Sequence, residues 1–303
     1  SILPKEITSV QLVKGGFNNK NIVINNTILI KEFLKRDEPN DPVYLRYLRE
    51  KEVLSLLVKY EHTPQLLNFF ESSPHFFIIR EWVMGSPLKI DQVSSFISHL
   101  TTALTLIHRF SKPLSGDFDY FDVIRRYLLE YKKLVSPLFD SSPEFSALPP
   151  QPLLSQFFDE CFQHISENYS ETTVCRIHGD LVLSNLILTQ KTKSIQFIDW
   201  EYSTLADPLI DLAYLISQNS LPLQIQQTII ESYEGHSNVQ INRAKLSVYC
   251  DLMNLMSGLW YAIHAARLKL MLLSEREHHP PVENFIKLAF KTFQTLKLNV
   301  KKL

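Results

Sequence analysis

The residues that could do chemistry are concentrated between positions 178 and 199. The segment IHGDLVLSNLIL places Asp180 five residues before Asn185, and Asp199 follows the next strand-like run. Phosphoryl transfer needs a carboxylate beside the attacking hydroxyl, oxygen ligands for magnesium and positive charge on the nucleotide phosphates. The spacing allows Asp180 to face a hydroxyl while Asn185 faces a metal. Asp199 can bind the same Mg²⁺, which prefers oxygen ligands and retains waters.

The elements that must position these residues begin with a small sheet. The runs VQLVKGG, NIVINN, TILIKEF, QLLNFF and HFFIIREWV favour β-strands and are separated by turn residues. Between the third and fourth runs, VYLRYLREKEVLSLLVKY has apolar residues at helical spacing. After Met84 the chain becomes mainly helical, and Asp91 is expected to cap a helix that continues to residue 110.

The remainder reads as helix with a β insert. Helices are predicted near 119–135 and 153–168, joined by a Pro- and Ser-rich surface connection at 141–152. The runs TVCRIH, NLILT and SIQFIDW form a short β island, and everything after about residue 208 reads as helix. This order predicts an α+β, two-lobed fold, with a β-rich lobe at residues 1–83, a larger helical lobe at 84–303 and a cleft at the crossover.

Composition excludes several classes of protein. The 303 residues include 31 basic and 32 acidic side chains, and the net charge of −1 lacks the basic excess of a nucleic-acid binder. The three cysteines have no zinc spacing and suggest no disulfide framework, as in a reduced cytoplasmic protein. No signal peptide is recognisable, and the longest apolar stretch, 252–266, is interrupted and shorter than the roughly 20 residues of a membrane span. The oligomeric state stays open.

The motif HGDLVLSN followed by FIDWEY resembles the aminoglycoside phosphotransferase and choline kinase superfamily, which has the protein-kinase fold. It is most similar to the choline, ethanolamine and thiamine kinases, and the likeness covers nearly the whole chain. The resemblance implies that Asp180 is the catalytic base and that His178 organises its loop. It also implies Asn185 and Asp199 as magnesium ligands, and Asp211 in ADPLIDLAYL as a structural brace of the catalytic loop.

The resemblance also implies a binding site for ATP. Lys31 in ILIKEF matches the strand lysine that contacts the phosphates, and Glu50 matches the helix glutamate that pairs with it. Glu52 is two positions further along the helix and faces elsewhere. The GGFNNKN turn resembles the phosphate-covering turn of the family, and REWVMG resembles the connector whose backbone hydrogen-bonds adenine. The implied residues of these two segments are Gly15, Gly16, Phe17, Asn18 and Asn19, and Glu81, Trp82 and Val83.

A small cationic alcohol is the expected acceptor. Only eleven residues separate Asp199 from Asp211, and no APE motif follows, so there is little scaffold for docking a peptide. Acidic side chains including Glu201 lie near Trp200 and Tyr202 in the sequence, and aromatic faces attract quaternary ammonium or thiazolium groups. The segment SGLWYAIHAARL resembles the helix that provides a cage tryptophan in choline kinases, which nominates Trp260.

Other functions remain open at this point. The chain has Ser257 where choline kinases often have a second tryptophan, and SEREHHPPVEN at 274–284 replaces an aromatic segment. Choline, ethanolamine, thiamine and an unrelated amino alcohol or sugar are therefore all candidates. An antibiotic-modifying aminoglycoside phosphotransferase is one alternative. A non-catalytic, nucleotide-binding pseudokinase is another alternative. A pseudokinase is expected to lack at least one of Lys31, Asp180, Asn185 and Asp199, whereas this chain has all four.

Overall fold

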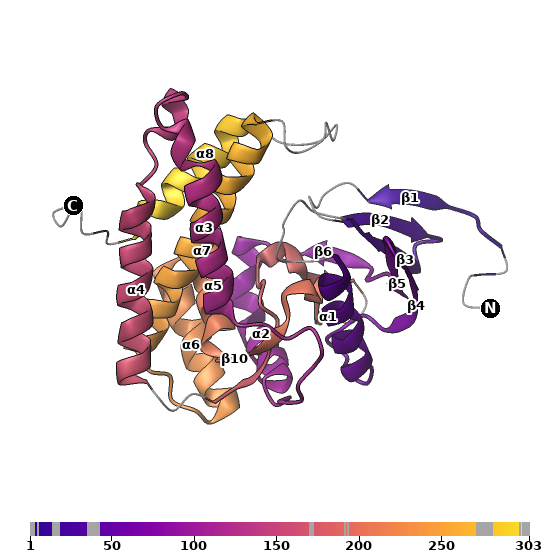
Figure 1. The fold of residues 1–303 in the computed structure, drawn as a ribbon. Helices are drawn as coiled ribbons and strands as arrows, with labels where there is room; N and C mark the ends of the chain where they lie inside the picture. Colours follow the sequence, from indigo (N-terminus) through magenta and orange to yellow (C-terminus); the bar gives the residue numbers. More distant parts are fainter. Residues whose placement is uncertain are drawn as a thin grey trace. The chain divides into compact units, whose positions relative to one another are not determined.

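The computed structural model describes residues 4, 6–13, 19–34, 43–169, 173–190, 192, 194–270, 281–296 and 298. The chain forms two compact units (Figure 1). The first contains residues 1–118 and 174–241, and the second contains residues 119–173 and 242–303. The division into lobes at residue 83 remains a prediction.

The first unit begins with a five-stranded antiparallel sheet in the order β1-β2-β3-β5-β4. Asn25 and Asn26 both have positive φ angles in the turn between β2 and β3, a conformation that asparagine tolerates well. Helix α1 packs against β3, β4 and β5, because Leu29, Phe33 and Ile78 are buried on the face that it covers. The five predicted strands and the predicted helix are confirmed: β1 (Val10–Val13), β2 (Asn19–Ile24), β3 (Ile28–Phe33), α1 (Val43–Leu56), β4 (Leu66–Ser72) and β5 (His75–Glu81).

The expected β island is divided between two small sheets. β6 (Gly85–Pro87), β8 (Leu186–Thr189) and β9 (Ile195–Phe197) form one sheet, while β7 (Cys175–Ile177) pairs with β10 (Thr204–Ala206) in the other. The sequence did not predict β6, whose Gly-Ser-Pro composition is atypical of a strand. Glycine is required at position 85, since a Cβ atom there would lie 2.3 Å from the carbonyl oxygen of Leu188.

Three helices and two single 3₁₀ turns complete the first unit. They are α2 (Ile90–Ile107), η3 (Leu183–Asn185), η4 (Trp200–Tyr202), α5 (Leu209–Gln218) and α6 (Leu223–Ser237). Helix α2 packs against α6. Asp91 does not cap α2 as predicted: the N-cap is Lys89, two residues earlier, and its N–H donates to Gln92 Oε1 at 3.1 Å. Asp91 instead lies in the first turn, where its charge complements the helix dipole.

The second unit consists of helices. Figure 1 shows α3 (Tyr120–Leu134), α4 (Gln151–Asn168), α7 (Arg243–Lys269) and α8 (Val282–Phe293), and α7 packs against the other three. The 141–152 stretch is not only a surface connection. It follows the 3₁₀ turn η1 (Ser136–Leu138) and contains a second one, η2 (Pro143–Phe145), which buries Phe145 completely. None of the helices described in either unit combines the length and the apolar character that crossing a bilayer requires.

Candidate active site

The loop between β7 and β8 holds Asp180 and Asn185 together. The Nδ2 group of Asn185 donates hydrogen bonds to the carboxylate Oδ2 of Asp180 at 2.9 Å and to its backbone oxygen at 3.0 Å. Gly179 has a φ of 80°, which few other residues adopt readily. The five-residue spacing therefore closes a loop in which the amide nitrogen of Asn185 binds Asp180, so the Oδ1 oxygen is the atom of this side chain that could bind a metal.

Asp211 fixes the backbone of this loop from α5. Its Oδ2 accepts a hydrogen bond from the N–H of His178, and its Oδ1 accepts one from the N–H of Gly179, both at 2.8 Å. His108 Nε2 lies 3.1 Å from Oδ2, and the Nδ1 of the same ring lies 2.7 Å from the Tyr233 hydroxyl. Asp211 is fully buried, so its charge is stabilised by these donors. These hydrogen bonds are the contacts that a brace of the catalytic loop would make, and the role of Asp211 stays a prediction.

His178 links the loop to the strand that precedes Asp199. Its Nε2 donates to the carbonyl oxygen of Ile198 at 3.0 Å, and its Nδ1 accepts from the N–H of Asp180 at 3.2 Å. Burial lowers the pKa of His178, so the ring is neutral, with its proton on Nε2. Both ring nitrogens are used within the protein, which fits a residue that organises the loop.

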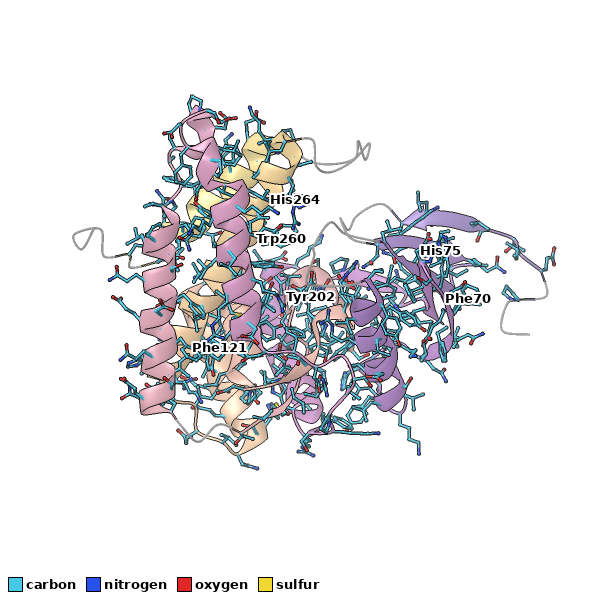
Figure 2. All side chains as sticks on the ribbon, viewed as in Figure 1. Phe70, His75, Phe121, Tyr202, Trp260 and His264 are labelled. Atoms are coloured by element: carbon cyan, nitrogen blue, oxygen red, sulfur yellow. The ribbon has the colours of Figure 1, made fainter. Side chains whose placement is uncertain are left out.

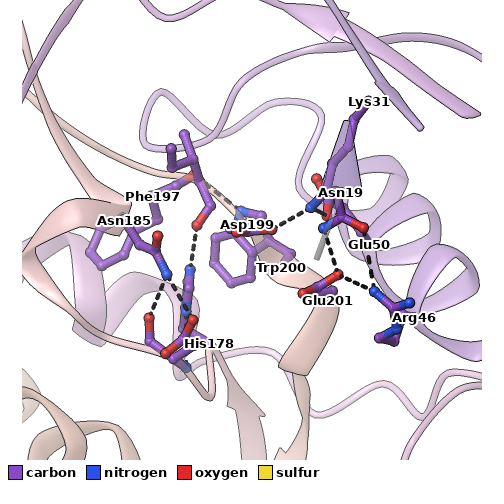
Figure 3. Close-up of polar contacts among 12 residues, drawn as sticks. Asn19, Lys31, Arg46, Glu50, His178, Asn185, Phe197, Asp199, Trp200 and Glu201 are labelled. Atoms are coloured by element: carbon purple, nitrogen blue, oxygen red, sulfur yellow. Dashed lines mark hydrogen bonds and ion pairs between the residues drawn. The ribbon is translucent and has the colours of Figure 1, made fainter. Parts of the chain in front are cut away.

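Lys31, Glu50 and Asp199 form an ion cluster in which Lys31 and Glu50 are buried (Figure 3). Lys31 Nζ lies 2.5 Å from Glu50 Oε2 and also bonds to Asp199 Oδ1. Burial disfavours the charged lysine, but the negative charges of Asp199, Glu50 and Glu201 outweigh this effect and raise the pKa of Lys31. Lys31 is therefore cationic at neutral pH, which suits its predicted contact with nucleotide phosphates. Glu52 faces away, and accepts hydrogen bonds from Ser115 instead.

Asp199 and Asn185 have the donor atoms that Mg²⁺ requires. The Asp199 side chain is 37% exposed, whereas its partner Lys31 is 3% exposed. Asp199 also has a φ of 71°, a strained conformation for a residue other than glycine and one that is common at functional sites. Among the described residues there is no group of three or more His, Cys, Asp or Glu side chains that could hold a metal. A group of three is not needed for Mg²⁺, because this ion retains waters and binds substrate phosphates. One oxygen from Asn185 and one from Asp199 would therefore be sufficient protein ligands.

The carboxyl group of Asp180 has a pKa close to neutral pH. Burial raises its pKa, and the negative charges of Asp199 and Glu201 raise it further, to about 7. Hydrogen bonds from Tyr214 and Asn185 act in the opposite direction. A carboxylate with this pKa can accept a proton at physiological pH far more readily than an ordinary aspartate. The sequence did not assign Tyr214 to the site, so its hydrogen bond to Asp180 was missed.

Glu201 and Trp200 lie in different surroundings from those predicted. Glu201 is 1% exposed, and its Oε2 accepts hydrogen bonds from Asn19 at 3.0 Å and from Arg46 at 3.2 Å. Trp200 is completely buried; its ring lies 4.5 Å from that of His178, and its Nε1 donates to the Phe197 carbonyl. Neither side chain presents a surface to a substrate, so we assign both to supporting the site. The sequence missed Arg46, although it lies four residues before Glu50 and hence on the same helical face.

The other predicted aromatic residues are partly exposed. Tyr202 is half-buried at the end of η4. Trp260 belongs to the second unit, where its ring stacks on His264 at 4.9 Å and packs edge-on against Phe285. Figure 2 labels Trp260 and His264. This stack leaves Trp260 partly accessible. The contact of Trp260 with an acceptor remains a prediction.

The predicted nucleotide-binding segments are described only in part. Gly15, Gly16, Phe17 and Asn18 lie outside the described residues, whereas Asn19 begins β2 and bonds to Glu201. In the connector after β5, the Glu81 N–H donates to Gln65 O and the Trp82 N–H donates to Thr27 O. Val83 follows and is buried. The described part of the connector is thus fixed by backbone hydrogen bonds at Glu81 and Trp82.

Comparison with known proteins agrees with these features. The choline/ethanolamine kinase family model matches residues 10–300. Protein LicA of Haemophilus influenzae is 28% identical over 174 residues, which are 55% of this chain and 60% of that protein. The chain spans only 47% and 60% of the length of two curated LicA relatives that it matches.

Solved structures extend the likeness to the whole fold. The choline kinase LicA from Streptococcus pneumoniae has a TM-score of 0.69 at 20% identity, covering 96% of this chain and 95% of that chain. An aminoglycoside 2′-phosphotransferase in complex with GDP has a TM-score of 0.65 at 18% identity, covering 96% and 94%. The predicted kinase-like α+β fold is therefore confirmed.

Proposed function

The chain belongs to the choline/ethanolamine kinase family, and from this premise we propose that it phosphorylates the hydroxyl of a small alcohol. The phosphoryl donor is a nucleoside triphosphate, for which the sequence predicts ATP, and the reaction requires Mg²⁺. The observation that carries this proposal is the grouping of Asp180, Asn185, Asp199, Lys31 and Glu50 within one compact unit. A pseudokinase would lack at least one of these side chains.

Each residue has a defined task in the transfer. Asp180 orients the acceptor hydroxyl and accepts its proton as the bond to phosphorus forms. Lys31, held by Glu50, neutralises charge on the transferred phosphates. Asn185 and Asp199 would hold Mg²⁺, which supplies charge neutralisation on the phosphate oxygens when bound. Asp211 and His178 keep the loop rigid, so Asp180 is positioned before the substrate binds.

We assign the acceptor to the class of small cationic alcohols, such as choline and ethanolamine. The family match and the LicA choline kinase support this class. The partly exposed carboxylate of Asp199 supplies negative charge near Asp180 within the first unit. An aminoglycoside acceptor is the second candidate, since the fold is shared with an aminoglycoside phosphotransferase.

A screen of acceptors tests this function. Release of nucleoside diphosphate from ATP and Mg²⁺ would be measured with choline, ethanolamine, thiamine, simple sugars and aminoglycosides, using Asp180→Asn as the inactive control. Strong stimulation by choline or ethanolamine, abolished in the variant, is the expected result. Stimulation by aminoglycosides alone would move the assignment to the second candidate. No stimulation by any acceptor, with nucleotide still bound, would favour a pseudokinase.

A further inference from the structure

Asn219, the C-cap residue of α5, binds the backbone of the loop at residues 178–185 through its side-chain amide. Its Oδ1 accepts a hydrogen bond from the N–H of Leu183 at 2.7 Å, and its Nδ2 donates to the carbonyl oxygen of Leu181 at 2.8 Å. The same Nδ2 donates to the carbonyl oxygen of Leu215 in its own helix, also at 2.8 Å. One side chain therefore holds the loop on both sides of Val182, although 36 residues separate Asn219 from Leu183.

The bond to Leu183 fixes the start of η3, the 3₁₀ turn that ends with Asn185. The first N–H groups of a helical turn have no partner within the turn, and the N-cap side chain commonly accepts from one of them. The N-cap of η3 is Val182, whose side chain has no hydrogen-bonding atom. Asn219 supplies an acceptor from another helix, so the position of η3 depends on α5.

The turn η3 is connected to the residues proposed for the transfer. Asn185 donates hydrogen bonds to the backbone oxygen of Asp180 at 3.0 Å and to its carboxylate at 2.9 Å. The backbone oxygen of Asn185 accepts from the N–H of Ile198 at 3.0 Å, and Ile198 directly precedes Asp199. A displacement of η3 would therefore change how Asp180 and the two proposed Mg²⁺ ligands lie relative to one another.

The amide of Asn219 has no donor left for a substrate. Its two N–H groups bond to Leu181 and Leu215, and the side chain is buried. Asp211 of the same helix binds the N–H groups of residues 178 and 179, at the other end of the loop. Because both residues belong to α5, this helix holds the loop before and after Asp180.

We propose that Asn219 is a positioning residue for phosphoryl transfer, which holds η3 so that Asn185 and Asp180 keep their relative positions. This inference rests on the proposed function, because it takes Asp180 as the proton acceptor and Asn185 as a ligand of Mg²⁺. Asn219 acts through the loop backbone and does not touch the substrate. If its role were only structural, its loss would lower stability without changing the chemistry of the folded protein.

Hydrogen exchange of the wild-type protein tests the contact without any substrate. The exchange rates of the backbone N–H groups of Leu183 and Gly179 would be measured by NMR. If α5 holds both ends of the loop, both amides exchange only when the loop opens, so their protection factors should agree within about 10-fold. A Leu183 amide that exchanges faster than this would overturn the proposal, and the comparison needs no variant.

The variant Asn219→Ala tests the effect on the reaction. We expect kcat to fall by at least about 10-fold, since a misplacement of about 1 Å in an active site can cost about 100-fold. The Mg²⁺ concentration that gives half of the maximal rate should rise, because Asn185 loses its fixed position. Asn168→Ala is the matched control: it removes a bond from Nδ2 to the carbonyl oxygen four residues earlier, that of His164 at 2.9 Å, at the end of α4. This control should leave both quantities unchanged.

Three results with the variants would overturn the proposal. They are equal losses of kcat in both variants, a loss of kcat in Asn219→Ala with unchanged Mg²⁺ dependence, and a lower Tm of Asn219→Ala with wild-type kcat. If Asn219→Ala does not fold, the exchange of the Leu183 amide in the wild type still decides the question.

Binding measurements distinguish this inference from the proposed function. If the wild type phosphorylates no acceptor, the proposed function fails. Calorimetric titration of the wild type and Asn219→Ala with ADP, with and without Mg²⁺, then still measures the effect on the proposed metal site. Weaker Mg²⁺-dependent binding by Asn219→Ala supports the role of Asn219, and equal affinity contradicts it.

Discussion

Arg46 of α1 donates a hydrogen bond at 3.2 Å to Glu201, although 155 residues separate them in the chain. Arg46 is fully buried and Glu201 nearly so, and Asn19 bonds to both side chains (Figure 3). The contact joins the helix that carries Glu50 to the segment that follows Asp199. The position of α1, and therefore the Lys31–Glu50 pair, is coupled to the segment that we propose binds Mg²⁺.

Removing the Arg46 side chain should therefore affect stability and activity together. Arg46→Met removes a hydrogen-bonded cation from the buried Glu201, and we expect unfolding to become easier by about 3 kcal/mol. The KM for nucleotide should rise because Lys31 loses its fixed position. Urea unfolding and steady-state kinetics would measure both effects. Lys51→Met is the control: it breaks the exposed pair with Glu71 on the same helix, where less than about 1 kcal/mol is expected. Equal effects of the two substitutions would contradict the coupling.

His108 should influence the rate without contacting the substrate. His108→Ala removes the donor to Asp211 and leaves the Tyr233 hydroxyl without its partner. We expect kcat to fall about 10-fold, because the backbone of residues 178 and 179 is held less firmly, while the KM for nucleotide stays nearly constant. His108→Asn, which retains a donor, should recover part of the loss. A large change in KM with constant kcat would show that His108 acts in another way.

Asp180→Asn should abolish turnover and stabilise the fold. The folded-state pKa of Asp180, about 7, lies above the ordinary value of about 3.9. The unfolded chain therefore loses this proton more readily, and the ionised carboxylate destabilises the fold as pH rises from about 4 to 7. The variant removes this cost, so its Tm should exceed that of the wild type above pH 7, and the difference should shrink toward pH 4. Nucleotide binding should be retained, which calorimetry would check. A Tm difference independent of pH would argue against the raised pKa.

The two tryptophans, Trp200 and Trp260, should behave oppositely when substituted. Trp200→Phe removes part of a fully buried ring, and we expect a loss of stability with an unchanged KM for the acceptor. Trp260→Ala removes a partly exposed ring, and if this ring contacts a cationic acceptor the KM for that acceptor should rise about 10-fold. Kinetics at saturating nucleotide, together with thermal unfolding, would separate the effects. A Trp260→Ala variant that loses only stability would show that the residue serves the α7–α8 packing.

The local geometry of the catalytic loop could be predicted from the sequence. Asp180 and Asn185 are five residues apart, so a short loop between two strands must bring them together. The Lys31–Glu50 pair also follows from one strand and one helix that are adjacent in the sequence. Most strands and helices, and the fold class, follow from periodic patterns of apolar residues, and the tertiary structure retains these elements.

Longer-range relationships could not be predicted in this way. Trp200 and Glu201 follow Asp199 in the sequence, and an aromatic ring and a carboxylate suit a cationic substrate. Both side chains are nevertheless buried in the protein interior, so the prediction that they bind the substrate was wrong. The contacts of Arg46 with Glu201 and of His108 with Asp211 join segments more than 100 residues apart.

The sequence by itself determined which reaction class we propose, because the residues predicted for phosphoryl transfer lie in short, regularly spaced motifs. Only the tertiary structure decided which polar side chains support the site and which remain for ligands. That division depends on burial and on hydrogen-bond partners from distant segments, and neither is encoded in local spacing. Asn219 illustrates the difference: in the sequence it is one amide near a helix end, and in the fold its side chain binds the backbone of Leu181 and Leu183.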